Sequence, residues 1–237
     1  SGHTNLEVAI DGATATITVG TMGWDGVEEI TFTATDSGNL SASTTAEFRV
    51  LARQAIPLVA GWNLIGPSLL PEDDATEEVL ASIAGKYDLV YTWDAATSGW
   101  LLYDISMHEM NMELTQLTRG QGLWVHVTED VALLHDGRAE GTTQIPVGED
   151  GWHLIAFATG VAEALPGALD DNGLEEAYSL VFAYDAADTA DPWKVYDPEA
   201  DAWANDLTAL EPGRGYWLRT GEGQSGTWTV AYERPAP

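Results

Sequence analysis

The stretch Gly61-Trp62-Asn63-Leu64-Ile65 recurs along the chain as Gly151-Trp152-His153-Leu154-Ile155. Three further blocks recur in the same order: residues 89–94 match 180–185, residues 100–104 match 193–197, and residues 114–124 match 207–217. The offset between matching positions stays within 90 to 93 residues. Four ordered blocks at a near-constant offset indicate an internal duplication. We therefore predict two homologous tryptophan-rich repeats, over residues 56–137 and 143–234.

Each repeat is expected to be mainly β, with one short helix. The Gly-Trp-x-Leu-Ile block alternates side chains as a strand does, and later blocks predict further strands. In the first repeat a helix is expected to start at a cap on Asp74 or Thr76 and to stop at Gly85. In the second repeat the matching stretch 161–169 contains Pro166-Gly167 and predicts a weaker helix. The apolar stripe of the first helix is Val79, Leu80 and Ile83.

The first 50 residues follow a different pattern, in which apolar and polar residues alternate with period two. Residues 6–10 and 15–19 flank Asp11-Gly12, which predicts a β-hairpin. Residues 29–35 and 43–50 flank the turn sequence Asp36-Ser37-Gly38-Asn39 and predict a second hairpin.

This segment resembles the closing strands of cadherin-like and related immunoglobulin-like domains of bacterial surface proteins. The residues that carry the resemblance are Ile10-Asp11-Gly12, Trp24-Asp25-Gly26 and the run from Ile30 to Ser43. Such sandwiches use about seven strands, whereas four are predicted here. We therefore expect residues 1–52 to be an incomplete sandwich, completed by the rest of the chain or, through self-association, by another copy.

The two repeats resemble tandem repeats with the pattern GWNLI…YD…PGxGYW near the ends of large exported proteins of bacteria and archaea. The second repeat matches best, through residues 184–185, 191–197 and 211–217. The first repeat departs from the pattern at Thr118-Arg119 and at Leu123. The resemblance implies an extracellular or cell-surface location and an accessory role.

The large excess of acidic residues and the absence of cysteine exclude several classes of partner and site. Acidic residues number 38 against 9 basic ones, giving a formal net charge of −29. Such a field repels phosphate backbones and anionic lipids, so we expect no nucleic-acid partner and no membrane insertion. Cysteine is absent from the sequence, which excludes disulfides, thiolate zinc sites and cysteine nucleophiles.

The sequence carries no nucleophile elbow, phosphate-binding loop or His-Glu-x-x-His motif. The five histidines show no ligand spacing, and for each of them we expect a structural or surface role. With 38 acidic residues, no single pair of carboxylates stands out as a catalytic pair for glycoside hydrolysis. We therefore predict that the chain is not an enzyme.

Calcium is the one cofactor that the sequence suggests. Asp36 lies in a pattern that resembles a calcium-ligand segment of cadherins, although the same residue could simply close its turn through the backbone. A second candidate metal site is the acidic loop that holds Asp185, Asp188 and Asp191.

Ten tryptophans make aromatic stacking on a ligand the leading kind of interaction. Trp100, Trp193 and Trp203 adjoin polar or acidic segments, and we predict that these three rings bind ligand. Those in the apolar strand blocks are expected to pack in the core instead: Trp62, Trp124, Trp152 and Trp217.

Together these patterns predict a non-catalytic binding or adhesion module of a secreted or cell-surface protein. Extracellular polysaccharide is the leading ligand class, and a surface protein is the other expected partner. One alternative is a structural spacer or surface-layer segment that binds no small ligand. A third is an enzyme such as a glycoside hydrolase.

Overall fold

The computed structural model describes residues 1–69, 71–107, 112–139, 141–149 and 151–235. Contacts divide the chain into two compact units, Ser1–Ala52 and a second unit that begins at Arg53. The protein is mainly β, with a large antiparallel sheet and a few short helices. Among the described residues, no helix is long and apolar enough to cross a membrane.

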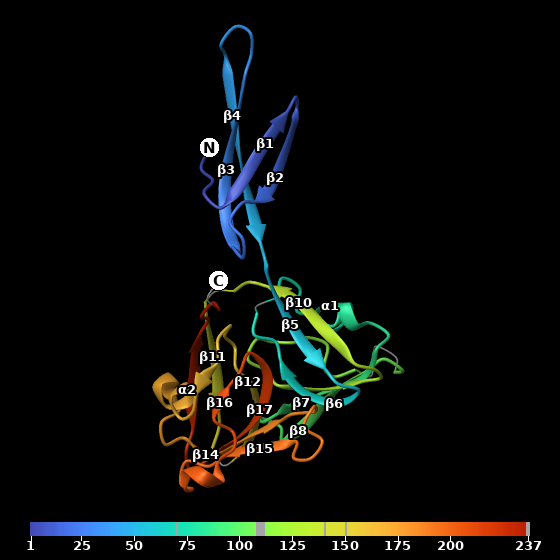
Figure 1. Ribbon diagram of the computed structural model, residues 1–237, viewed down its shortest axis with the longest axis vertical. Helices are drawn as coiled ribbons and strands as arrows, with labels where there is room; N and C mark the ends of the chain where they lie inside the picture. Colours follow the sequence, from blue (N-terminus) through green and yellow to red (C-terminus); the bar gives the residue numbers. More distant parts are fainter. Residues whose placement is uncertain (70, 108–111, 140, 150, 236–237) are drawn as a thin grey trace. The chain divides into compact units, whose positions relative to one another are not determined.

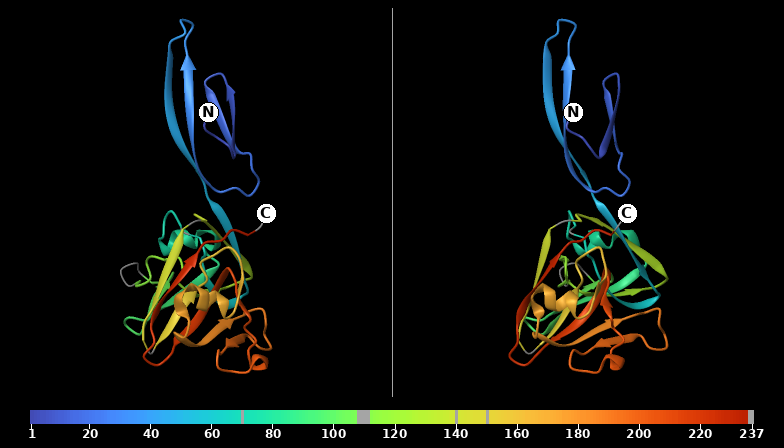
Figure 2. Two further views of the ribbon diagram at one scale, coloured as in Figure 1. Left: turned by 90° about the vertical axis from the view of Figure 1, so that its left-hand side faces the viewer. Right: turned by 60° about the vertical axis from the view of Figure 1, so that its left-hand side comes forward.

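The first unit consists, within its described residues, of two antiparallel hairpins (Figure 2). Their strands are β1 (Leu6–Asp11), β2 (Thr14–Val19), β3 (Gly26–Thr35) and β4 (Ser41–Val50). Both lie where the alternating pattern predicts them. Leu6 and Ile30 are buried, whereas Ile10 is 70% exposed and Leu40 is 75% exposed.

The carboxylate of Glu28, on β3, binds the chain where β1 begins. The side chain of Glu28 accepts hydrogen bonds from the backbone N–H groups of Thr4, Asn5 and Leu6, the shortest at 2.7 Å from Asn5. Thr31 of the same strand also donates to the Ser1 carbonyl oxygen at 3.0 Å and accepts from the Ser1 ammonium at 3.1 Å. That a further chain segment completes the sheet stays a prediction.

The second unit is built on an eight-stranded antiparallel sheet formed by the described residues of both repeats (Figure 1). The strand order is β15-β14-β17-β6-β9-β7-β8, and β12 also pairs with β17. The first repeat supplies β6 (Gly61–Gly66), β7 (Tyr87–Asp94), β8 (Gly99–Asp104) and β9 (Leu123–Val127). The second repeat supplies β12 (Trp152–Ala156), β14 (Tyr178–Tyr184), β15 (Trp193–Tyr196) and β17 (Gly213–Thr220).

The two repeats enter this sheet in equivalent ways. The pairing of β6 with β9 in the first repeat matches that of β12 with β17 in the second. In the same way, the pairing of β7 with β8 matches that of β14 with β15. At the centre Gly66 pairs with Gly213 of the other repeat, and Gln121 forms the matching bridge to Ile155. Since equivalent strands lie in one sheet with equivalent side chains on one face, an approximate two-fold axis runs perpendicular to the sheet.

Glycine is required where the repeats meet. A Cβ atom added to Gly66 would lie 2.0 Å from the Cβ of Ala156, its equivalent in the second repeat. A Cβ on Gly122 would lie 2.6 Å from the carbonyl oxygen of Ile155, and one on Gly215 would lie 2.5 Å from that of Ile65. The repeated Gly-x-Gly motif therefore permits the close backbone approach that joins the two repeats.

Three two-stranded sheets and four helical segments cover one face of the large sheet. They are β5 (Ala52–Leu58) with β10 (Val131–Gly137), β11 (Thr142–Val147) with β18 (Gly226–Ala231), β13 (Glu163–Ala164) with β16 (Ala209–Leu210), and the helical segments α1 (Thr76–Val79), η1 (Ala81–Ile83), α2 (Gly167–Leu169) and η3 (Asp170–Leu174). Each repeat has its own apolar core between the sheet and these elements. The remaining helical segment, η4 (Ala202–Ala204), follows β15 and has no buried residue. Trp228 is fully buried in the second core and stacks on Phe157.

The helix expected in the first repeat is present as α1 and η1, and its predicted stripe of Val79, Leu80 and Ile83 is buried. The helical segment ends just before Gly85, as predicted, and Gly85 has a φ of +76°. The predicted N-terminal cap on Asp74 or Thr76 is wrong. Among the described residues no side chain caps α1, and the Thr76 hydroxyl instead donates to the carbonyl oxygen of Leu114 at 2.8 Å. Thr76 is fully buried, and its hydroxyl bonds this carbonyl, in the segment between β8 and β9, rather than the helix terminus.

The position after the first tryptophan differs between repeats. The Asn63 side chain accepts from the Val59 N–H at 2.9 Å and donates to the Val59 carbonyl at 2.7 Å, which fixes the preceding turn. Its equivalent His153 is also buried, and its Nε2 lies 3.2 Å from the carbonyl oxygen of Gly148. Burial lowers the pKa of His153 below its ordinary value.

Replacing Gly66 with alanine should lower the free energy of unfolding by about 1–3 kcal/mol, because the added methyl overlaps the Ala156 side chain. Adding Ala156→Gly to Gly66→Ala removes the overlapping methyl and should restore most of the loss. Urea denaturation of both single variants and the double variant measures the coupling. Additive losses would show that the two positions do not pack against each other.

His153→Asn should reduce the acid sensitivity of the fold. A histidine whose pKa is lower in the folded state binds protons preferentially when unfolded, so its contribution is complete above about pH 6.5 and declines as the pH falls below that value. The free energy of unfolding should therefore fall less between pH 7 and pH 5 in the variant than in the parent protein. Identical pH profiles in urea denaturation would contradict this assignment.

Candidate functional site

The sheet of the second unit carries a second, uncovered face made of aromatic rings. Core residues such as Val90, Val125 and Val181 alternate along the strands with these rings, which therefore point the other way. Within the described residues the set, here called the aromatic face, is Trp62, Tyr91, Trp93, Trp100, Trp124, Trp152, Phe182, Tyr184, Trp193 and Trp217. Its outer tryptophans are strongly exposed, up to 45% for Trp100.

The rings form a continuous circuit rather than separate pairs. In order around the circuit they are Trp62, Trp124, Trp193, Phe182, Trp152, Trp217, Trp100 and Tyr91, which returns to Trp62. Ring centroids along the circuit lie between 5.6 Å (Trp217 to Trp100) and 6.4 Å (Trp62 to Trp124) apart. Most contacts are edge-to-face, the arrangement in which aromatic pairs attract each other. Each ring therefore holds its neighbours in place.

The circuit crosses between the repeats at two equivalent places. Trp100 of the first repeat contacts Trp217 of the second at 5.6 Å, and Trp193 of the second contacts Trp124 of the first at 5.9 Å. Two further rings also contact the opposite repeat: Trp93 of the first repeat contacts Trp217, and Tyr184 of the second repeat contacts Trp124.

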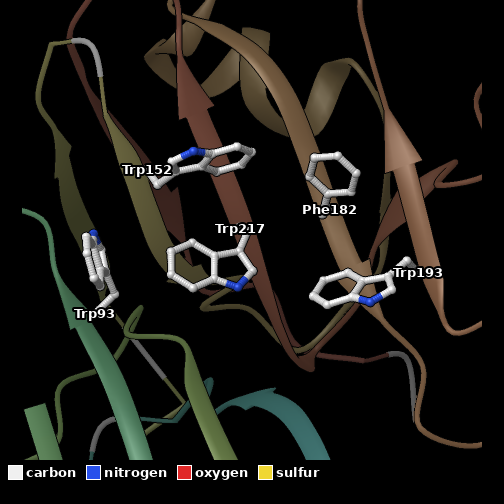
Figure 3. A pocket seen from close by; sticks show the side chains of 5 residues that line it. All are labelled: Trp93, Trp152, Phe182, Trp193 and Trp217. Atoms are coloured by element: carbon white, nitrogen blue, oxygen red, sulfur yellow. The ribbon is translucent and has the colours of Figure 1, made fainter. Parts of the chain in front are cut away.

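Two pockets open on the aromatic face. One has a volume of about 440 Å³ and is lined by Trp93, Trp152, Phe182, Trp193 and Trp217 (Figure 3). The other has a volume of about 500 Å³ and is lined by Trp62, Tyr91, Trp100, Trp124 and Tyr184. Both volumes fall in the range of small-molecule sites. We call them the Trp152 pocket and the Trp62 pocket.

Polar groups are sparse and lie at the rim. The Arg219 guanidinium is 5.9 Å from the Trp152 ring centroid, a cation–π contact. The equivalent residue in the first repeat, His126, lies 4.9 Å from the Trp62 ring and 2.6 Å from an oxygen of Asp88. These contacts orient Trp62 and Trp152.

The indole N–H groups of the aromatic face are available to a ligand. In the described part of the chain none of them donates a hydrogen bond to protein, whereas Trp203 donates to Asp201 at 3.2 Å and Trp228 to the Ala168 carbonyl at 2.9 Å. The face therefore combines flat apolar surface with unused donors at ring edges.

The structure brings together two of the three tryptophans predicted to bind ligand. Trp100 and Trp193 lie in the aromatic face, each on a different repeat. Trp203 lies apart on η4, is 85% exposed, and makes no ring contact within the described residues.

The prediction that Trp62, Trp124, Trp152 and Trp217 pack in the core is wrong. None of them belongs to either core cluster, and Trp62 and Trp152 are 38% and 37% exposed. Their strands do carry core residues, but on the opposite side. Alternation predicts that a strand has two different faces, and it does not predict which face other elements cover. The clue in the sequence is that one strand of each repeat carries two aromatic residues two positions apart, Tyr91 with Trp93 and Phe182 with Tyr184.

The candidate metal ligands each have local partners. Asp36 accepts from the backbone N–H groups of Gly38 and Leu40 at 2.8 and 2.9 Å, as in the turn-closing alternative. Lys194 lies 2.9 Å from Asp188 and 3.6 Å from Asp191. Asp185 lies 3.6 Å from Arg214. Within the described residues no group of three or more acidic or histidine side chains is placed to hold a metal ion, and calcium stays a prediction.

The acidic loop of the second repeat is held by its own polar network. Hydrogen bonding to Lys194 lowers the pKa of Asp188, and the same contact raises the pKa of Lys194. The Val195 N–H donates to Asp206 at 2.6 Å, and the Asn205 side chain bonds the backbone of Asp197. These bonds fix the loop that follows β15. Of the five histidines, His108 lies outside the described residues.

No known protein family, curated protein or solved structure was found to match this chain. The function must therefore be argued from the site itself.

The aromatic face should contribute much less to stability than the buried tryptophan does. Trp152→Ala removes a partly exposed ring and should cost about 1–2 kcal/mol of unfolding free energy through its lost ring contacts. Trp228→Ala empties a fully buried site and should cost about 3–5 kcal/mol. Urea denaturation compares the two variants. Equal losses would mean that the aromatic face is itself a core.

Proposed function

We propose that the chain is a non-catalytic binding and adhesion module of a secreted or cell-surface protein, and that its aromatic face binds a neutral polysaccharide. The observation that carries the proposal is the uncovered circuit of rings on a rigid sheet. Exposed apolar patches of this kind on soluble proteins mark interaction sites.

Carbohydrate fits the chemistry of the aromatic face. A pyranose ring with equatorial hydroxyls offers a flat C–H surface that stacks on an aromatic ring, while its hydroxyls accept hydrogen bonds from donors at the ring edges. The partly exposed indoles of Trp62, Trp100, Trp152 and Trp193 supply both kinds of contact. The neighbouring rings hold these indoles in position, so that little conformational entropy is lost on binding.

Charge favours a neutral polymer over an anionic one. The formal net charge of −29 repels uronic-acid polymers and other polyanions. Arg219 and His126 are the two basic side chains that contact the rings of this face among the described residues. A neutral glycan with equatorial substituents, such as a β-1,4-linked glucan or chitin, is therefore the preferred ligand.

The lining of the two pockets supports binding without cleavage. Glycoside hydrolysis requires two carboxyl groups beside the bond that is broken. Both pockets are lined by aromatic side chains alone. An enzyme such as a glycoside hydrolase is therefore a weaker candidate for this site.

The extracellular setting and the cadherin-like and tandem-repeat relationships are part of the same proposal. They are supported by the resemblances in sequence and by the two hairpins of the first unit. The proposal includes calcium binding at Asp36 or in the region 185–191. Millimolar calcium should raise the melting temperature if either site binds the ion.

A structural spacer or surface-layer segment is the second candidate function. It is favoured by the apolar character of the same pockets, because two copies could bury their aromatic faces against each other. This alternative predicts self-association without glycan binding.

Binding is tested with insoluble cellulose and chitin, using sodium polygalacturonate as the anionic contrast in affinity electrophoresis. The parent protein should bind at least one neutral polymer and should not be retarded by polygalacturonate. The double variant Trp62→Ala/Trp152→Ala loses a ring from each pocket and should bind at least about tenfold more weakly.

Trp203→Ala is the matched control, since it removes an exposed tryptophan outside the aromatic face. It should bind like the parent, and a loss in this variant alone would move the site to the acidic loop. Failure to bind either neutral polymer, together with a dimer in sedimentation that the double variant abolishes, would replace the proposal with the structural alternative.

A further inference from the structure

The two pockets are copies of one another. Every residue that lines the Trp152 pocket has its equivalent in the Trp62 pocket at the offset of the internal repeat. The pairs are Trp152 with Trp62, Phe182 with Tyr91, Trp193 with Trp100, Trp217 with Trp124, and Tyr184 with Trp93. The duplication has therefore produced two sites of one design on a single face.

Each pocket is completed by the other repeat. Four of the rings in the Trp152 pocket come from the second repeat, but Trp93 comes from β7 of the first (Figure 3). In the Trp62 pocket the reverse holds, and Tyr184 comes from β14 of the second repeat. Contacts of 6.1 Å from Trp93 to Trp217 and 5.1 Å from Tyr184 to Trp124 fix these exchanged rings. A single repeat would therefore form neither pocket completely.

The two-fold axis also sets the direction of a bound chain. Because the axis is perpendicular to the sheet, it reverses any direction that lies along the face. A polysaccharide has distinct reducing and non-reducing ends. If both pockets hold the polymer in the same way, the segments in them must run in opposite directions, so that one straight chain cannot occupy both equivalently.

We propose that the aromatic face holds two polysaccharide segments at once, one in each pocket and running antiparallel. This inference rests on the proposed glycan-binding function. It assigns the protein a second role, in which one molecule links two chains of the polymer. Multivalent binding of this kind requires no contacts beyond those that the two pockets already provide.

The two sites differ in detail, and their affinities should differ accordingly. The Trp62 pocket contains the hydroxyl groups of Tyr91 and Tyr184, where the Trp152 pocket has Phe182 and Trp93. The basic residue beside the outer tryptophan is His126 in one case and Arg219 in the other. We expect the Trp62 pocket to be the more dependent on ligand hydroxyls.

Indole N–H resonances distinguish the two pockets in solution. A titration of ¹⁵N-labelled protein with cellotriose and with chitotriose should shift the indole signals of both pockets. Trp203, Trp228 and Trp24 lie outside the aromatic face, so their signals should remain in place and serve as internal controls. In Trp152→Ala the shifts at Trp193 and Trp217 should be lost while those at Trp62 and Trp100 persist. Trp62→Ala should give the converse pattern.

The exchanged rings give a sharper test of the pocket assignment. Trp93→Ala should weaken binding at the Trp152 pocket of the other repeat by several-fold and leave the titration of Trp62 close to that of the parent. Trp100 does not serve as a reporter in this variant, because its ring centroid lies 5.3 Å from that of Trp93. Tyr184→Ala should do the reverse. If each variant affects the pocket of its own repeat instead, the assignment is overturned.

Linking of chains is measured with a soluble neutral polymer, glycol chitin or hydroxyethyl cellulose. The parent protein should raise the viscosity of the polymer solution. Trp62→Ala and Trp152→Ala should each still bind but raise it no further than bovine serum albumin does. Parent-like viscosity in the single-pocket variants would overturn the two-segment inference.

The outcomes separate this inference from the function on which it rests. Shifts confined to one pocket, or shifts in both that a single variant abolishes, would leave glycan binding intact and overturn the two-segment inference. The absence of any shift with either trisaccharide, together with failure to bind cellulose or chitin, would overturn both.

Discussion

The two repeats approach each other so closely at the centre of the sheet that only the smallest side chains fit between them. A methyl group on Gly66 would overlap Ala156, and methyl groups on Gly122 and Gly215 would strike backbone oxygens of the opposite repeat. This close approach lets β6 pair with β17 and lets Gln121, just before β9, pair with β12. A continuous sheet across the duplication follows from it, and so does the shared face on which the rings of one repeat contact those of the other.

The aromatic face follows from the same sheet through alternation of side chains. Each repeat needs one covered face for its apolar core, and three two-stranded sheets and short helical segments supply the cover. The opposite face keeps large rings exposed, and their edge-to-face contacts stabilise one another without any layer above them. The rings of this face are therefore accessible to a ligand and are also held in place by their neighbours.

Much of the architecture could be predicted from the sequence, because duplication and period-two alternation are visible without coordinates. The hairpins of the first unit and the β6 and β9 strands lie where these patterns place them. The candidate site was harder to predict. Trp100 and Trp193 adjoin polar segments, but Trp62 and Trp152 lie among Leu and Ile, a pattern that favours the core. Burial depends on which elements pack on which face, and that is a property of the tertiary fold. The cap of α1 was mistaken for a similar reason, since a distant carbonyl at Leu114 takes the Thr76 hydroxyl.

The perpendicular two-fold axis gives this single polypeptide the symmetry of a homodimer. One ancestral repeat, associating with itself through a glycine at the axis, would have formed two identical composite pockets. Isologous interfaces place the same residues on both sides, so neither pocket of such a dimer could change alone. Fusion into one chain removes that constraint. In a homodimer, any one substitution would change both pockets together. The fused chain instead carries different residues at three equivalent positions: Phe182 and Tyr91, Tyr184 and Trp93, and Arg219 and His126. In the fused chain, one pocket can therefore acquire a substitution while the other keeps its residue.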